Sequence, residues 1–103
     1  MQTFKRVTII GPGLIGASLG LAIKKKGLAE EVIGVGRRES SLQTALDIGA
    51  IDRSTLDPAE GVEGADLVVL ATGVATALKL GLAVMPHLKA GCLLIDVASA
   101  KTY

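Results

Sequence analysis

Short apolar runs divide this chain into regularly spaced units. Four runs are almost continuously apolar, which is typical of strands covered on both faces: Arg6–Ile10, Glu31–Gly36, Asp66–Thr72 and Cys92–Val97. A shorter run, Ala50–Asp52, predicts one more strand between the second and third of these. The pattern therefore predicts about five strands.

Segments with apolar residues at helical spacing separate these strands. Glycines and serines mark their ends, because serine caps helix N-termini and glycine ends helices. The helical segment Ala75–Leu88 is apolar on most sides, so we expect that helix to be largely buried. The predicted helices cover about Leu14–Lys26 before Gly27, the residues from Ser40 or Ser41 to Gly49, and Ala75–Leu88.

The order of these elements predicts the fold class. Asp57–Gly64 contains a proline and two glycines, so we expect a loop or a single turn there. Strands that alternate with helices predict an α/β fold, a doubly wound parallel sheet with helices on both faces. Such sheets bind ligands beyond the carboxyl ends of their strands. Here these ends are Gly11–Gly13, Gly36–Arg38, Thr72–Gly73 and Val97–Ser99.

Composition narrows the function without identifying it. The 103 residues fit one domain, and eleven basic against ten acidic residues leave a net charge of +1. This balance argues against nucleic-acid binding through a basic surface. Cys92 is the only cysteine, which excludes a disulfide scaffold, and its apolar surroundings predict a buried, inert thiol. One histidine and one cysteine cannot assemble a zinc site of the usual kinds, so we expect no metal.

The N-terminal region superficially resembles a membrane segment or signal peptide. Lys5 and Arg6 precede seventeen uncharged residues, and three lysines follow them. A helix that spans the hydrocarbon needs about 20 residues. The Gly-Pro-Gly at 11–13 would also interrupt such a helix near its start. We therefore expect no membrane partner and a cytoplasmic location.

A glycine-rich turn joins the first strand to the first helix. Residues 11–16 read Gly-Pro-Gly-Leu-Ile-Gly. The pattern Gly-x-Gly-x-x-Gly is common, but its position between a strand and a helix is typical of dinucleotide-binding domains. Gly11 permits the tight turn, Gly13 leaves room for a pyrophosphate, and Gly16 lets the helix approach the sheet. The amides of Leu14 and Ile15 face the phosphates, together with the helix dipole. The alternative is a glycine turn that only packs.

The end of the second strand bears on which dinucleotide binds. NAD-specific domains place Asp or Glu about 20 residues after the glycine motif, where the carboxylate holds the ribose hydroxyls. This chain has Gly36 there, followed by Arg37, Arg38, Glu39 and the two hydroxyl residues Ser40 and Ser41. Guanidinium groups suit the 2′-phosphate of NADP. The sequence thus favours NADP over NAD, the alternative being a solvated basic pair partnered by Glu39.

Several segments together resemble one enzyme family. Residues 7–19, Val-Thr-Ile-Ile-Gly-Pro-Gly-Leu-Ile-Gly-Ala-Ser-Leu, are similar to the opening of prephenate and arogenate dehydrogenases, in which Gly-Leu-Ile-Gly-x-Ser is distinctive. Further similar segments follow in the family's order, at 28–35, 45–52, 66–72 and 86–101. The resemblance covers nearly the whole chain but only about the first third of the family's length. It implies a Rossmann-like domain, truncated after about five strands.

The resemblance also implies an activity and site residues. Family members oxidise prephenate or arogenate by hydride transfer to the nicotinamide with loss of carbon dioxide, on the route to tyrosine. The family's Asp-x-x-Ser-x-Lys element corresponds here to Asp96, Ser99 and Lys101. The resemblance places Ser99 beside the nicotinamide and the substrate hydroxyl, as a catalytic and cofactor-binding residue; the alternative is a turn or helix-cap serine. Thr72 and Gly73 stand where the family usually has Thr-Pro, in the loop flanking the nicotinamide.

Two parts of the family's machinery lie beyond the resemblance. The family's catalytic histidine belongs to a His-Pro element further along, and its helical C-terminal domain supplies substrate contacts and the homodimer. His87 does not replace that histidine, because we expect it at a helix end away from the strand carboxyl ends. We therefore expect one domain, residues 1–103, that binds NADP without turnover, with an exposed last strand and self-association. The alternatives are the cofactor domain of another NADP-dependent reductase, acting on an imine or hydroxy acid, and a non-catalytic NADP-sensing module.

Overall fold

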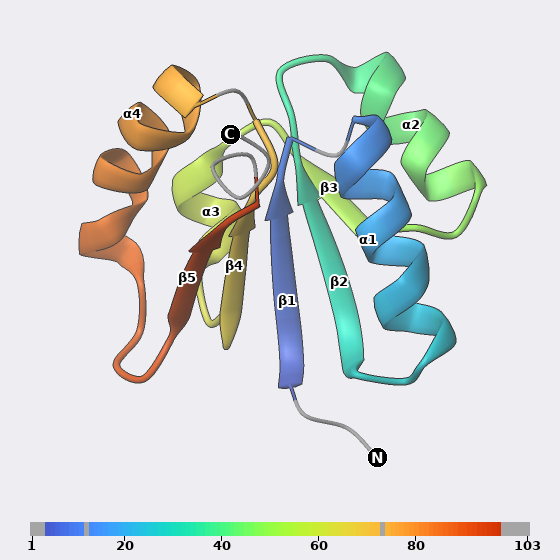
Figure 1. The fold of residues 1–103 in the computed structure, drawn as a ribbon, viewed down its shortest axis with the longest axis horizontal. Coiled ribbons are helices and arrows are strands. Elements are labelled where there is room, and N and C mark those ends of the chain that lie inside the picture. Colours follow the sequence, from blue (N-terminus) through green and yellow to red (C-terminus); the bar gives the residue numbers. More distant parts are fainter. Residues whose placement is uncertain (1–3, 12, 73, 98–103) are drawn as a thin grey trace.

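A single parallel sheet forms the centre of the molecule. The computed structural model describes residues 4–11, 13–72 and 74–97 of the chain. Within them the strand order is β3-β2-β1-β4-β5, and every neighbouring pair is parallel. The doubly wound fold is confirmed, and the order reverses beside β1 (Figure 1). The strands are β1 (Phe4–Ile10), β2 (Ala29–Val35), β3 (Arg53–Thr55), β4 (Leu67–Leu70) and β5 (Leu93–Asp96).

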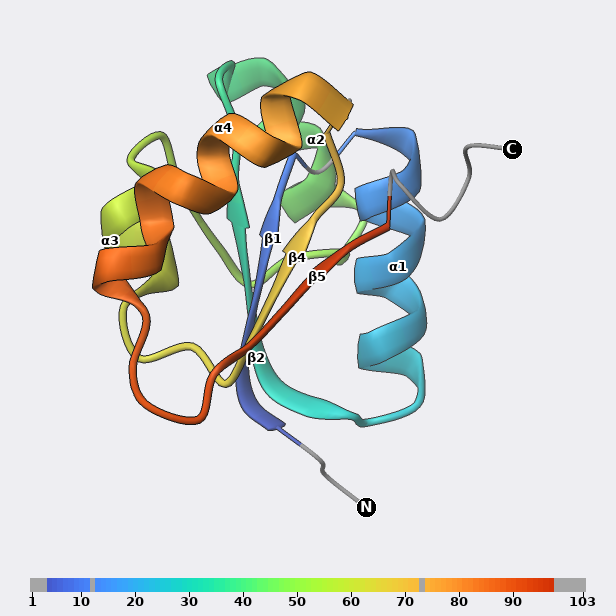
Figure 2. The same ribbon diagram turned by 60° about the vertical axis from the view of Figure 1, so that its left-hand side comes forward.

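Helices cover both faces of the sheet, and each face has its own apolar core. Figure 2 shows α1 and α4 on opposite sides of the strands. Along β1, Val7 and Ile9 pack in one core, while Ile10 packs in the other. Burial on both faces is the reason that the strands are apolar without alternation. The helices are α1 (Leu14–Lys25), α2 (Glu39–Asp47), α3 (Pro58–Val62), α4 (Val74–Val84) and the 3₁₀ turn η1 (Met85–His87).

Two local predictions from the sequence are wrong. Ala50–Asp52 is not a strand; the third strand, β3, begins directly after this segment, at Arg53. Ala50 and Ile51 are apolar because they are buried in the core, while the Asp52 amide donates to the Val32 carbonyl at 2.7 Å. Neither Ser40 nor Ser41 caps the second helix, because α2 begins at Glu39 and its N-cap is Arg38, without a side-chain cap.

Asp57–Gly64 contains little more than the single turn that we expected. The Asp57 side chain accepts a hydrogen bond from the Ala59 amide at 3.0 Å and caps α3, which begins at Pro58. The last predicted helix divides into α4 and η1, and His87 lies exposed at the end of η1, as expected.

The prediction that the last helix is largely buried is wrong. Leu78 and Leu82 of α4 are 68% and 63% exposed and Met85 of η1 is 54% exposed, because no described element covers this outer side. The expected exposure of the last strand is confirmed within the described residues, where β5 is an edge of the sheet and Leu93 and Ile95 are exposed. Cys92 precedes β5 and is half-buried rather than buried, and burial raises the pKa of its thiol. In the described part of the chain, no helix has the length and apolarity needed to cross a bilayer.

Candidate functional site

A cleft lies at the carboxyl ends of the strands, where the strand order reverses. Its volume is about 400 Å³. Segments that follow β1, β2, β3 and β4 form it, together with one residue each of α2 and α4 and the start of α3. This is the position at which open α/β sheets bind ligands. The described lining residues are Ile10, Gly11, Gly13, Val35, Gly36, Arg37, Arg38, Ser41, Leu56, Pro58, Ala71, Thr72 and Leu80.

Two glycines of the first turn are required by the protein's own packing. Gly11 has φ +83°, and a Cβ there would clash with the methyl group of Thr72. Its amide donates to the Val35 carbonyl at 2.7 Å, which ties the turn to β2. A Cβ on Gly16 would lie 2.7 Å from the carbonyl oxygen of Gly11. These contacts hold α1 close to the sheet and fix the direction in which its N-terminus points.

Gly13 has no such structural requirement. A Cβ built on it would meet nothing within 4 Å, although the residue lines the cleft. Its φ of −74° is one that any residue adopts. The open space at Gly13 therefore fits a ligand that approaches the backbone more closely than a side chain would allow.

The N-terminus of α1 offers backbone donors at this open space. Gly13 is the N-cap and provides no side-chain acceptor, and the Ala17 amide donates to the Gly13 carbonyl at 2.7 Å. The amides of Leu14, Ile15 and Gly16 precede that bond, so helical geometry leaves them without an intrahelical acceptor. Three such amides and the positive end of the helix dipole make a site for a phosphate.

A second helix begins at the same cleft. The N-cap of α2 is Arg38, and the Leu42 amide donates to its carbonyl at 3.3 Å, so the preceding first-turn amides are also without intrahelical acceptors. Arg37 and Arg38 are exposed, and neither forms an ion pair with any described residue. Ser41 lines the cleft, whereas Ser40 is not among the described lining residues. None of these lining residues is acidic.

The end of β4 contributes a buried hydroxyl. The Oγ1 atom of Thr72 is inaccessible to solvent and has no hydrogen-bond partner in the part of the chain that the structure describes. Buried polar atoms are normally paired, so an orphaned hydroxyl in a cleft fits a missing ligand. The predicted site residues Gly73 and Ser99 lie outside the described residues, as do Pro12 and Lys101.

Seven lining residues were not among the predicted cofactor-binding residues, and three of them, Ile10, Val35 and Ala71, lie at the ends of the strands β1, β2 and β4. Leu56, Pro58 and Leu80 form an apolar wall, and Ser41 lies beside the arginines. Leu56 is 49% exposed although it is a large aliphatic residue. Nothing in the local sequence marks Leu56, Pro58 and Leu80, because the fold alone brings the start of α3 and the middle of α4 to the cleft.

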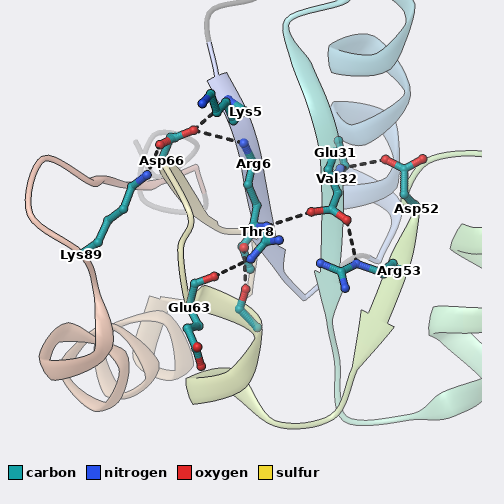
Figure 3. A network of polar contacts seen from close by, with 11 residues as sticks. Lys5, Arg6, Thr8, Glu31, Val32, Asp52, Arg53, Glu63, Asp66 and Lys89 are labelled. Carbon is teal, nitrogen blue, oxygen red and sulfur yellow. Dashed lines mark hydrogen bonds and ion pairs between the residues drawn. The ribbon is translucent and has the colours of Figure 1, made fainter.

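Carboxylates with depressed pKa values lie at the other end of the sheet. Asp66 pairs with Lys89 and accepts the amides of Arg6 at 3.1 Å and Lys5 at 2.7 Å, which lowers its pKa to about 2 (Figure 3). Burial raises the pKa of Asp52, but a hydrogen bond from Lys24 and the Val32 amide outweigh it and leave the pKa lowered. No described group with a shifted pKa lines the cleft. Among the described residues no cluster suited to a metal ion is present.

Comparison with known proteins identifies the family. The family model for the nucleotide-binding domain of prephenate dehydrogenase matches residues 19–103. The chain belongs to this family. The prephenate dehydrogenase of Lactococcus lactis subsp. cremoris (strain MG1363) is 36% identical over 99 residues, which are 95% of this chain. This nucleotide-binding domain spans only 27% of the length of that relative.

Solved structures agree with this assignment. The arogenate dehydrogenase of Synechocystis aligns with a TM-score of 0.81 and 27% identity, over 88% of this chain and 32% of its own. The prephenate dehydrogenase of A. aeolicus, solved in complex with hydroxyphenyl propionate and NAD+, has the same fold, with a TM-score of 0.81. Its identity of 23% extends over 89% of this chain and 32% of that one. The glycine turn at residues 11–16 precedes the matched range, which begins at residue 19.

Proposed function

We propose that this chain is the NADP-binding part of a prephenate or arogenate dehydrogenase, an enzyme of tyrosine biosynthesis. The observation that carries the proposal is one cleft at which two helices begin, both without side-chain caps and one beside two unpaired arginines. When bound, the nicotinamide cofactor accepts a hydride while the substrate loses carbon dioxide. The residues of this chain bind and orient that cofactor.

The first helix supports binding of the pyrophosphate. The amides of Leu14, Ile15 and Gly16 are available there, and Gly13 leaves space for the approach of the phosphates. A side chain at this position would fill the space, and a carboxylate would also repel the negative charge of the phosphates. Gly11 and Gly16 act indirectly, because their packing sets the position of α1.

The second helix supports NADP rather than NAD. A 2′-phosphate near the start of α2 would meet Arg37, Arg38 and the hydroxyl of Ser41. Guanidinium groups bind phosphate in bidentate fashion, and an acid that would repel it is absent from the described lining. The NAD+ complex of the A. aeolicus relative supports a pyridine nucleotide in this fold, while the preference for NADP rests on these arginines.

The nicotinamide end of the site is assigned to the loops after β4 and β5. Thr72 offers its buried hydroxyl there, and we propose that Gly73 and Ser99 complete the contacts. Among the described cleft residues none is a histidine or carboxylate suited to take the substrate's proton. We therefore propose that substrate binding and acid–base chemistry belong to a further part of the enzyme, and that this domain alone binds the cofactor without turnover.

Calorimetric titration of the chain with NADP+ and with NAD+ tests the cofactor assignment. We expect NADP+ to bind at least tenfold more tightly. Replacing both Arg37 and Arg38 with alanine should remove that preference while changing NAD+ affinity less than about threefold. Arg53→Ala is the matched control, since Arg53 is an exposed arginine outside the cleft. Tighter binding of NAD+, or an equal loss in the control, would contradict the proposal.

Turnover provides a separate test. We expect no NADPH when the chain is mixed with NADP+ and either prephenate or arogenate, at cofactor concentrations that saturate the site. Substantial NADPH production would show that the described domain contains the complete machinery, contrary to the proposal.

A further inference from the structure

One wall of the cleft consists of three aliphatic side chains and offers no group that binds phosphate. Its members, here called the apolar wall, are Leu56, Pro58 and Leu80. Leu56 directly follows β3, Pro58 begins α3 and Leu80 belongs to α4. Figure 2 shows α3 and α4 on the same side of the sheet, which is why residues so distant in sequence line one cleft. A wall of this composition contacts an apolar part of a ligand rather than a charge.

Leu56 differs from the other two members in its packing. Its side chain is 49% exposed, and it belongs to neither apolar core of the sheet. Leu80, by contrast, packs against the core that contains Ile10 and Val35. A single exposed leucine is ordinary on a protein surface, but Leu56 lies in a cleft beside two further aliphatic residues. Its exposed area is therefore available to a ligand and is not needed by the fold.

The chemistry of NADP places the adenine base beside this wall, an inference that rests on the proposed function. The base, the 2′-phosphate and the pyrophosphate of NADP are all linked to one ribose. With the pyrophosphate at the start of α1 and the 2′-phosphate at Arg37 and Arg38, the base lies within a few ångströms of the loop after β2. The Gly36 amide of that loop donates to the Thr55 carbonyl at 3.3 Å, so Leu56 is directly adjacent to it.

We propose that the apolar wall holds the base by its ring faces without reading its edge, and that Leu56 is a specificity-determining residue of the cofactor site. The three side chains carry no hydrogen-bonding atom, and Pro58 also lacks an amide proton. The polar side chains of the described lining belong to the phosphate and nicotinamide ends of the site: Arg37, Arg38, Ser41 and Thr72. No described lining side chain is left to recognise the 6-amino group of adenine.

The range of ligands follows from this composition. A site that hydrogen-bonds a group rejects an analogue without that group by a large factor, whereas an apolar site discriminates poorly between molecules of the same shape. Hypoxanthine has the rings of adenine with an oxygen in place of the amino group, so it covers the same area of the wall. The site therefore accepts purine dinucleotide phosphates that differ at position 6 of the base.

Calorimetric titration with NADP+ and with nicotinamide hypoxanthine dinucleotide phosphate tests this indifference to the base edge. We expect the two dissociation constants to agree within about fivefold, because the wall contacts both bases in the same way. A loss of more than about fivefold for the hypoxanthine compound overturns the proposal, since it reveals a hydrogen bond to the 6-amino group.

Substitution of Leu56 tests its role. Leu56→Ala should weaken both dinucleotides by the same factor, about fivefold, because it removes apolar area that either base covers. Leu56→Met keeps that area and should restore the affinity of the parent chain. Ile48→Ala is the matched control, since Ile48 is also 49% exposed and lies outside the described lining of the cleft. Circular dichroism checks that the variants fold. Unchanged affinity in Leu56→Ala, or an equal loss in Ile48→Ala, overturns the proposal.

The outcomes separate this inference from the proposed function. If neither dinucleotide binds the parent chain, the proposed cofactor site fails and this inference fails with it. If NADP+ binds and the hypoxanthine compound does not, the cofactor site stands and only the inference on the base fails. The same holds if NADP+ binds the parent chain and Leu56→Ala equally well.

Discussion

Two buried threonine hydroxyls, one in β1 and one just after β4, differ in whether they have a hydrogen-bond partner. Thr8 lies in β1, and its hydroxyl donates to the Gly61 carbonyl at 2.7 Å. Thr72 follows β4, and its hydroxyl has no partner in the described part of the chain. Since a buried hydroxyl costs free energy unless it is paired, Thr8 belongs to the fold, whereas the unpaired hydroxyl of Thr72 fits the ligand site proposed above.

The surroundings of the two residues extend this contrast. Toward the amino end of the strands, Glu31 binds Arg6 at 2.8 Å and Arg53 at 2.7 Å, while Asp66 accepts two strand amides (Figure 3). At the carboxyl end, first-turn amides and two arginines have no such partners among the described residues. Polar groups that pair with one another hold the amino end of the sheet together, whereas the unpaired groups at the carboxyl end are those that the proposed site uses.

The largest expected effect is on ligand binding through Gly13. Gly13→Val adds a side chain where the protein leaves open space, so the free energy of unfolding should stay unchanged. NADP+ affinity should fall at least a hundredfold, or about 2.7 kcal/mol. Calorimetry and thermal unfolding measure the two quantities. Gly11→Val is the contrasting variant and should lose both, because of its φ of +83° and the clash with Thr72.

The next prediction concerns the free energy of unfolding when the hydroxyl of Thr8 is removed. Thr8→Val should lower the free energy of unfolding by about 1–3 kcal/mol, because the Gly61 carbonyl, which Thr8 normally pairs, is left buried without its donor. Denaturant titration measures this loss. A variant as stable as the parent would show that the amino end does not depend on this bond.

The same substitution at the other hydroxyl should have the opposite sign. Thr72→Val removes an unpaired buried hydroxyl, so stability should stay constant or rise by up to about 1 kcal/mol. NADP+ affinity should fall about fivefold, as expected for one lost hydrogen bond worth ~1 kcal/mol. Destabilisation as large as that of Thr8→Val would contradict the contrast.

The smallest effect concerns pH. The hydrogen bond from Lys89 and two amides hold the pKa of Asp66 at about 2, below its ordinary value of 3.8. Its contribution to stability is therefore complete above about pH 4 and is lost as the pH falls toward 2. In the Asp66→Asn variant, the midpoint of unfolding should depend less on pH between about pH 2 and pH 4 than it does in the parent chain. Asp47→Asn is the control, as Asp47 bonds only the side chain of Gln43 among the described contacts.

Local sequence predicted most of the sheet and the position of the first glycine turn well. Strands buried on both faces are recognisable as continuous apolar runs. The spacing Gly11-x-Gly13-x-x-Gly16 is the one required by the tight turn between the first strand and helix of a dinucleotide-binding domain. The wrong predictions share a cause. Ala50–Asp52 is apolar because it is buried, which is also true of strands, and α4 is apolar on the face that the domain leaves open. Apolar character alone therefore distinguishes neither a strand from other buried backbone nor a buried helix face from an exposed one.

The sequence by itself determined the order of elements, the glycine turn and the missing acid after β2, because each depends on residues adjacent in the chain. Only the tertiary structure decided which residues meet at the cleft. Leu56, Pro58 and Leu80 reach it because α3 and α4 pack on the same face of the sheet. Tertiary structure alone also distinguished Thr8 from Thr72, since a hydroxyl's partner lies far away in sequence, 53 residues for Thr8. Hydrogen bonds and packing between distant segments depend on the folded chain, and no local pattern specifies them.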